Sequence, residues 1–331
     1  MRMIVAWVGT HRMLSVVLVL LALFLLVNFL AYRHACTMSH FARGLPKAAP
    51  DDRPHPEAMS LGQKVGVLLG GLTIHRPENL VTPGSLGLDY ETDAFPGEAG
   101  ALEGWYAPHA DSRGLVLIFH GYGSCKGEML PELKGFHDLG YSCFLIDFPA
   151  SGGSEGDVTT VGWREAGDVA RTLEYARKRW PGQRLIVFGQ SMGAAAVLRA
   201  MAVQHIRADA TVLECPFDTL LHTVEKRFHA MGLPGFPGAE LLMFWGGVQL
   251  GFNTFANNPV DYAKSATGPI LMLHGEIDPR VSGPQLRSIY DNLPCEKELH
   301  VFDGLGHESY ASARPEEWKA CVGRFLEKRA K

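Results

Sequence analysis

Residues 184–203 read RLIVFGQSMGAAAVLRAMAV and decide the fold class of this chain. The first part, RLIVFGQ, is an almost continuous apolar run of strand length, as expected for a parallel strand covered on both faces. The second part, MGAAAVLRAMA, is rich in alanine and has a high helix propensity. Between them stands Ser191 in a Gly-x-Ser-x-Gly pattern, whose glycines leave room for a tight strand-to-helix turn. The stretch therefore predicts a nucleophile elbow with Ser191 as the nucleophile.

A second Gly-x-Ser-x-Gly match lies at residues 152–156, GGSEG, and centres on Ser154. An elbow needs a strand directly before the serine and a helix directly after it. Ser154 comes well after its apolar run and is followed by GDVTTVG, which is not helical. We therefore interpret Ser154 as a turn residue.

Outward from the elbow, apolar runs of strand length alternate with helical patterns. Such alternation is typical of βαβ units and a doubly wound, mostly parallel sheet, so we expect the α/β class. Two further runs, Tyr90–Phe95 and Leu102–Tyr106, predict an antiparallel hairpin at one edge. Strands are expected at Leu115–His120, Tyr141–Asp147, Arg184–Gly189, Ala210–Glu214, Ile270–His274 and Glu298–Phe302, and helices near 126–139, 162–180, 192–205, 283–293 and 315–329.

The alternation is interrupted between the runs ending at 214 and beginning at 270. This interval contains LLHTVEKRFHAMGL and AELLMFWGGVQLGF, which predict an insertion of two helices, the second apolar nearly all round. A helix of that kind either forms a binding surface or a lid, or simply packs against the sheet. We expect one α/β domain at 81–331, with a lid insertion at about 217–262.

A serine needs a base, and the base needs a carboxylate that orients it. In chains with this elbow, the acid and the base follow the nucleophile. Asp278 lies in the loop after ILMLH, and His307 lies in the glycine-flanked loop after the last strand, so both reach the same edge of the sheet. We expect Asp278 as the acid and His307 as the base. The rival acids are Glu214 above all, then Glu276 and Asp303.

An acyl-transfer site also needs N–H donors for the oxyanion. One is expected from Met192, the residue after the nucleophile, at the start of a helix whose dipole favours negative charge. The other is expected from the Tyr122 amide in the loop His120-Gly121-Tyr122-Gly123-Ser124. The alternative for that loop is an ordinary strand-to-helix turn.

The composition excludes other classes of function. With 31 Lys and Arg against 35 Asp and Glu, the net charge is −4, which leaves no basic surface for nucleic acid. The 6 cysteines contain no CxxC pattern and no metal-ligand spacing. No Walker or dinucleotide-binding pattern is present. We expect neither a cofactor nor a metal, and no nucleic-acid partner.

Near the N-terminus, Met13–Tyr32 reads MLSVVLVLLALFLLVNFLAY without a charged residue. About 20 such residues span the hydrocarbon core of a bilayer, which predicts a single-pass anchor at 1–32. A cleaved signal peptide fits less well, because Arg33 would stand at the −3 position of a cut after Ala35. A buried core helix is the other alternative. The flanking charges do not resolve the membrane side; they are Arg2 and Arg12 before the span, and Arg33, Arg43, Lys47 and Arg53 after it.

Between the anchor and the domain, the segment 33–80 carries Pro46, Pro50, Pro54 and Pro56 before the apolar stretch LGQKVGVLLGGL. We predict a juxtamembrane linker with a short helix near 57–70.

These motifs together resemble the α/β-hydrolase superfamily, and more narrowly its membrane-anchored α/β-hydrolase-domain proteins and their bacterial relatives, the serine aminopeptidase-like or lysophospholipase-like hydrolases. The resemblance runs from Thr82 to Phe325 through TPGSLGL, GWYAP, HGYG, DFPASGGSEG, GQSMG, NPVDYA, HGEIDPRV and GLGH. It implies Ser191 as nucleophile, Asp278 as acid and His307 as base. It also implies the Tyr122 and Met192 amides as the oxyanion hole. DFPASGGS departs from the family, which often has an arginine between the aspartate and the glycines.

The expected function is a membrane-anchored serine hydrolase that cleaves an acyl ester through an acyl-enzyme, in the manner of a carboxylesterase or lipase. Its expected partners are a small-molecule or lipid acyl substrate and the membrane. An amidase, aminopeptidase or acyl-protein thioesterase uses the same triad. An aminopeptidase needs lid carboxylates for the peptide amine, and the two predicted lid helices supply only Glu225 and Glu240. The non-enzymatic alternative is an inactive binding scaffold, against which the intact Ser, Asp and His argue.

Overall fold

The computed structural model describes residues 2–42, 59–71 and 73–329. The predicted linker lies partly outside them, as do Arg43, Lys47, Arg53 and the first two positions of the helix expected near 57–70. The described residues form an eight-stranded sheet in the order β1-β2-β4-β3-β5-β6-β7-β8. The strands are β1 (Glu91–Pro96), β2 (Ala101–Ala107), β3 (Leu115–Phe119), β4 (Ser142–Ile146), β5 (Leu185–Gln190), β6 (Ala210–Glu214), β7 (Ile270–Gly275) and β8 (Lys297–Phe302).

The predicted α/β class and the mostly parallel sheet are confirmed. Strands β3 to β8 pair in parallel, while β1 and β2 form the antiparallel hairpin predicted at one edge. Side chains alternate along β3, with Leu117 in the core on one face and Val116 and Ile118 in the core on the other. Both faces of the sheet are therefore covered, as a continuous apolar run requires.

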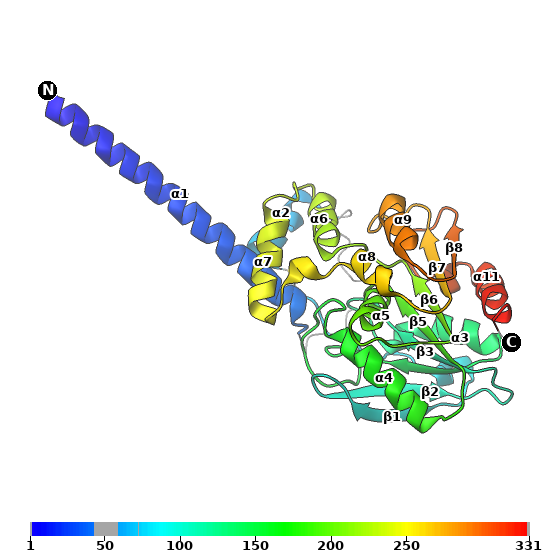
Figure 1. Ribbon diagram of the computed structural model, residues 1–331. Helices are drawn as coiled ribbons and strands as arrows, with labels where there is room; N and C mark the ends of the chain where they lie inside the picture. Colours follow the sequence, from blue (N-terminus) through cyan, green and yellow to red (C-terminus); the bar gives the residue numbers. More distant parts are fainter. Residues whose placement is uncertain (1, 43–58, 72, 330–331) are drawn as a thin grey trace.

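Helices on the two faces complete the three layers (Figure 1). One core contains side chains of α4 (Glu165–Arg179), α5 (Met192–Val203) and α9 (Gly283–Asn292). The other contains side chains of α3 (Leu130–Asp138), α10 (Tyr310–Ala313) and α11 (Pro315–Glu327). Short 3-10 turns, η3 (Pro83–Leu86) and η4 (Lys126–Met129), precede β1 and α3.

Helix α4 begins three residues later than the predicted start at 162. The Glu165 carboxylate accepts hydrogen bonds from the amides of Thr160 (2.8 Å) and Gly162 (3.0 Å). These bonds hold the preceding residues in a turn, in which Gly162 has a positive φ of 92°.

The interval between β6 and β7 contains the two predicted helices, α6 (Leu220–Ala230) and α7 (Gly238–Leu250). They are followed by the short elements η5 (Thr254–Ala256), α8 (Pro259–Tyr262) and η6 (Ala263–Ser265). Helix α7 is apolar on both sides, since Leu242 and Met243 are buried whereas Phe244 and Val248 are exposed.

The N-terminal helix α1 (Arg2–Ser39) is longer than its apolar run and projects from the body of the molecule (Figure 1). Within it, Met13–Ser39 is long and apolar enough to cross a membrane. Helix α2 (Leu61–Gly70) and helix α7 lie beside its C-terminal part. The chain after α1 docks on the domain, because His40 bridges to Val158 and Ala42 to His75.

Candidate active site

Ser191 lies at the sharp turn between β5 and α5, as predicted. Its backbone has φ 50° and ψ −109°, a conformation that a non-glycine residue rarely adopts. The flanking glycines are required by space: a Cβ on Gly193 would lie 2.4 Å from the Phe119 carbonyl oxygen, and one on Gly189 would lie 2.7 Å from the carbonyl carbon of Gly193. The close approach of α5 to β3 and β5 thus places Ser191 at the tip of the turn, where it is half-buried.

Three side chains predicted from separate loops meet at this turn. His307 Nδ1 donates a hydrogen bond to Asp278 Oδ2 (2.7 Å), and His307 Nε2 accepts one from Ser191 Oγ (3.1 Å). The Asp278 side chain is fully buried, and that of His307 is 10% exposed. A carboxylate only accepts hydrogen bonds, so Nδ1 carries the proton and Nε2 is free to take one from the serine.

Asp278 is held in its ionised form. Burial alone raises the pKa of this carboxyl, but the hydrogen bond and charge of His307 outweigh burial, so the pKa lies below its usual range. The amides of Arg280 (2.7 Å) and Val281 (2.9 Å) donate to Asp278 Oδ1 and favour the same form.

Two of the rival acids, Glu214 and Glu276, are hydrogen-bonded elsewhere, and the third, Asp303, is exposed. Glu214 is buried and accepts hydrogen bonds from Gln190 Nε2 (3.0 Å) and Trp318 Nε1 (3.3 Å). Burial, together with the neighbouring Glu132, raises its pKa well above the usual range. Glu276 accepts from the Gly304 amide (2.9 Å), and Asp303 is exposed. Of the four carboxylates considered, Asp278 is the one that accepts a hydrogen bond from His307.

Cys215, which the sequence reasoning did not single out, also faces His307. Its Sγ lies 3.8 Å from His307 Nε2, and burial raises the pKa of the thiol well above its usual value. The described part of the chain holds one group of potential metal ligands, whose ligand atoms all lie within 4.8 Å of one another: Cys215, Asp278 and His307. Two of the three are already hydrogen-bonded to each other. The position of Cys215, directly after a strand that ends beside the elbow, is the signal that could have found it.

The loop expected to supply the second oxyanion donor lies directly against the elbow. A Cβ on Gly121 would be 3.5 Å from Ser191 Cβ. His120 Nδ1 donates to the Gly121 carbonyl (2.8 Å), while His120 Nε2 accepts from the Phe148 amide (3.0 Å). Because the peptide unit is planar, fixing the Gly121 carbonyl also fixes the direction of the Tyr122 N–H.

The side chain of Tyr122 is held by the N-terminal helix and by α6. Its hydroxyl donates to the Met38 carbonyl (2.5 Å), and its ring meets the Phe41 ring edge-on at 5.4 Å. On the α6 side, the Arg227 guanidinium lies 4.9 Å from the ring centroid. The C-terminal turn of α1 therefore touches the loop that borders Ser191.

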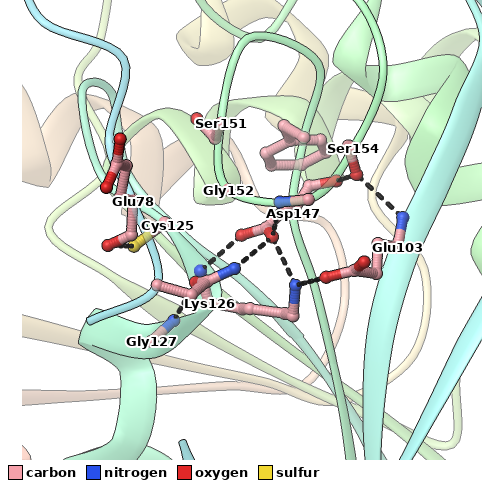
Figure 2. A network of polar contacts seen from close by, with 12 residues as sticks. Glu78, Glu103, Cys125, Lys126, Gly127, Asp147, Ser151, Gly152 and Ser154 are labelled. Atoms are coloured by element: carbon pink, nitrogen blue, oxygen red, sulfur yellow. Dashed lines mark hydrogen bonds and ion pairs between the residues drawn. The ribbon is translucent and has the colours of Figure 1, made fainter. Parts of the chain in front are cut away.

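Behind this loop lies a buried ionic network that the sequence did not reveal (Figure 2). The Lys126 ammonium pairs with Asp147 and, at 2.7 Å, with Glu103, and the side chains of Lys126 and Asp147 are fully buried. The Lys126 amide donates to Asp147 Oδ1 (2.7 Å). Ser154 belongs to the same network, since its hydroxyl donates to the Asp147 carbonyl (2.6 Å) and accepts from the Glu103 amide (2.8 Å). Ser154 is thus a buried structural residue, whereas its sequence context predicted only a turn residue.

The loop at 151–156, which lacks the arginine common in similar hydrolases, receives a guanidinium from elsewhere. Arg76 donates to the carbonyls of Ser151 (3.0 Å), Gly152 (3.3 Å), Gly156 (2.6 Å) and Ser154. A residue from the segment before the first strand therefore fixes the turn that follows β4.

Comparison with known proteins agrees with this architecture. Residues 110–231 match the sequence model of the family described as "Serine aminopeptidase, S33". YqkD of Bacillus subtilis, itself described as uncharacterized, is 24% identical over 230 residues, which cover 68% of this chain and 75% of YqkD. Protein bem46 of Schizosaccharomyces pombe is 24% identical over 238 residues, which cover 70% of this chain and 75% of bem46.

Among solved structures, the esterase Pf2001 of Pyrococcus furiosus superposes with a TM-score of 0.65 at 25% identity, covering 78% of this chain and all of the esterase. The family match and the esterase structure support a hydrolase. By its sheet, its elbow and these similarities, the chain belongs to the α/β-hydrolase superfamily.

Proposed function

We propose that this protein is a membrane-anchored serine hydrolase that cleaves carboxylic esters through an acyl-enzyme. The observation that carries the proposal is the continuous hydrogen-bonded path from Asp278 through His307 to Ser191. A serine hydroxyl is a weak nucleophile unless a positioned base removes its proton, and this path supplies the base and fixes its tautomer.

The proposed reaction has two steps. Ser191 Oγ attacks the acyl carbonyl while its proton passes to His307 Nε2, and the resulting imidazolium is stabilised by the buried Asp278 carboxylate. The amides of Met192 and Tyr122 receive the oxyanion, and His307 returns the proton to the leaving alcohol. Water, deprotonated by His307, then attacks the acyl-enzyme, releases the acid and restores Ser191.

Membrane anchoring through α1 is part of the proposal. Its support is the apolar stretch Met13–Ser39, which is long enough to span a bilayer. The helix also continues without interruption past Ala35, where a signal-peptide cut would fall, and Ala35 is buried. A cut there would remove the greater part of a helix whose last turn accepts the hydrogen bond of Tyr122.

The proposed substrates are esters derived from lipids. Helices α6 and α7 pack on each other, and α7 packs on α1. The insertion beside the active-site loop is therefore also beside the anchor, and acyl chains in the membrane lie within its reach.

The test is labelling of the full-length protein with a fluorophosphonate probe, followed by hydrolysis of an ester series of increasing chain length. We expect labelling of the native protein and of Ser154→Ala, and none of Ser191→Ala. Ser154→Ala removes two buried hydrogen bonds, so its folding is checked by circular dichroism. Labelling that persists in Ser191→Ala, or its absence from folded native protein, contradicts the proposal.

A further inference from the structure

A group of apolar side chains around the base of α1 remains exposed on the surface. Helix α2 presents Leu61, Val65 and Leu69, spaced four residues apart and therefore on one face of the helix. Phe244 and Val248 repeat this spacing on α7, and Phe236 precedes that helix. We name this group the apolar collar; its exposed fractions are 79% for Leu61, 45% for Val65, 60% for Leu69, 74% for Phe236, 53% for Phe244 and 56% for Val248.

The elements of the collar are fastened directly to α1 (Figure 1). From α7, Trp245 Nε1 donates to Asn28 Oδ1 (3.2 Å) and Gln249 Nε2 donates to the Tyr32 carbonyl (2.7 Å). The rings of Tyr32 and Trp245 meet edge-on at 5.5 Å. These contacts fix the height of α7 along the N-terminal helix.

Helix α2 is fastened to the next turn of α1. The Arg33 guanidinium donates to the Gly70 carbonyl (3.2 Å), and the His34 ring donates through Nε2 to the Leu68 carbonyl (3.0 Å). At its other end, α2 is joined to the insertion by Lys64 Nζ, which donates to the Ala230 carbonyl (3.3 Å). The two helices that carry the apolar stripes thus contact the same short length of α1.

That length coincides with the end of the apolar run. At 1.5 Å per residue, Asn28 lies about 6 Å inside the run that ends at Tyr32, and Met38 lies about 9 Å beyond it. The headgroup layer of one leaflet is about 5–8 Å thick. With α1 across a bilayer, α7 therefore lies level with the edge of the hydrocarbon, and the Met38–Tyr122 contact lies near the outer limit of the headgroups.

We propose that the hydrolase domain rests on the lipid surface through the apolar collar, in addition to being anchored by α1. This inference depends on the part of the proposed function that places α1 across the membrane. The occupant is lipid because the collar adjoins the exposed apolar surface of α1, so a protein that covered the collar would have to lie in the same layer as the acyl chains. Arg33 and Lys64 stand beside the apolar stripes, the combination typical of helices that lie in an interface.

The consequence for the active site is a short path for the substrate. Tyr122 joins the Ser191 elbow to Met38, and Arg227 of α6 covers the same ring. With the collar seated in lipid, the loop beside Ser191 would lie close to the headgroups of the leaflet that holds the acyl chains.

The test uses full-length protein in liposomes of phosphatidylcholine and phosphatidylglycerol, with a nitroxide attached to one introduced cysteine at a time. The background carries Cys36→Ser and Cys295→Ser, because the other four cysteines are buried. Phe244→Cys and Leu69→Cys report on the collar, and Leu18→Cys reports on the span. Val301→Cys, an exposed valine on β8 across the domain from α1, is the matched control (Figure 1). Folding of each variant is checked by circular dichroism.

We expect relaxation by oxygen to exceed relaxation by a water-soluble nickel chelate at Leu18, Phe244 and Leu69, and the reverse at Val301. If the nitroxides at Phe244 and Leu69 behave like the one at Val301, while the one at Leu18 lies in lipid, the collar proposal is wrong and the anchor proposal stands. Protection from both reagents shows a protein neighbour such as a second copy of this chain, which also overturns lipid as the occupant. A nickel-accessible Leu18 overturns the membrane part of the proposed function itself.

Discussion

Replacing Lys126 by methionine tests whether the buried ionic network stabilises the loop beside Ser191. The side chains of Lys126 and Asp147 are fully buried, whereas Glu103 is 32% exposed. Removing one partner of a buried ion pair costs about 3–5 kcal/mol, because the other charge is left uncompensated. Asp147 would keep three neutral donors, namely the amides of Lys126 and Gly153 and the side chain of Asn79. We therefore expect the lower end, about 3 kcal/mol.

For a domain of this size, about 3 kcal/mol lowers the melting temperature by about 6–12 °C. The assay is thermal unfolding of native protein, Lys126→Met, Asp147→Asn and the double variant. Lys126→Met leaves Asp147 without its cation, and Asp147→Asn leaves Lys126 without this carboxylate. In the double variant neither charge is left unpaired in this way, so it should be about 2 kcal/mol more stable than the sum of the two single effects predicts. A Lys126→Met melting temperature within 1 °C of native, or strictly additive effects, refutes the reasoning.

The same pair has a defined pH dependence. Burial raises the pKa of Asp147, but the Lys126 charge outweighs burial and brings this pKa below the usual value. A lowered folded pKa contributes stability above about pH 4, the ordinary value, and this contribution is lost as the pH falls through the folded pKa. The deficit of Lys126→Met should therefore be constant from pH 5 to 7 and shrink below about pH 4.

Three other substitutions test the site. Asp278→Asn should lower kcat for a short-chain ester by about 10⁴-fold, whereas Glu214→Gln should stay within a few-fold of native; the opposite ranking in steady-state kinetics would transfer the acid role to Glu214. Burial and Glu132 raise the folded pKa of Glu214, so keeping this side chain neutral costs more folding free energy as the pH rises above about 4.3. Melting curves at pH 5.5 and 8 should therefore show that Glu214→Gln gains stability over native protein at the higher pH. The absence of this trend would contradict the raised pKa. Gly193→Ala brings a Cβ within 2.4 Å of the Phe119 carbonyl oxygen, so it should cost at least about 1–3 kcal/mol and abolish fluorophosphonate labelling; unchanged melting and labelling would mean that α5 can shift freely.

Much of this arrangement was predictable because its causes are local in sequence. The parallel strands are nearly continuous apolar runs, and the elbow needs only the residues around Ser191. Asp278 and His307 could be selected because each follows a strand directly, and parallel strands end at one edge of the sheet. The roles of these residues in catalysis remain predictions.

The supporting interactions could not be read from the chain because their members come from separated segments. Lys126 meets Glu103 and Asp147 only once β2, β4 and η4 have assembled. Arg76 reaches its loop from a segment that the sequence presents as linker. The extension of α1 beyond Tyr32 was likewise hidden, because the apolar run ends there and tertiary contacts sustain the helix to Ser39.

The unbroken course of α1 from its apolar stretch to Tyr122 also determines how turnover should be measured. A domain joined to its anchor by a flexible linker would move through a volume of solution, and the concentration that governs its rate would be the bulk concentration of substrate. With α1 across a bilayer, as proposed, a helix whose last turn is hydrogen-bonded to the active-site loop would confine Ser191 to a plane of fixed height. For a lipid substrate the governing variable then becomes its surface density, so KM should follow mole fraction in the bilayer and stay constant when vesicles of one composition are diluted.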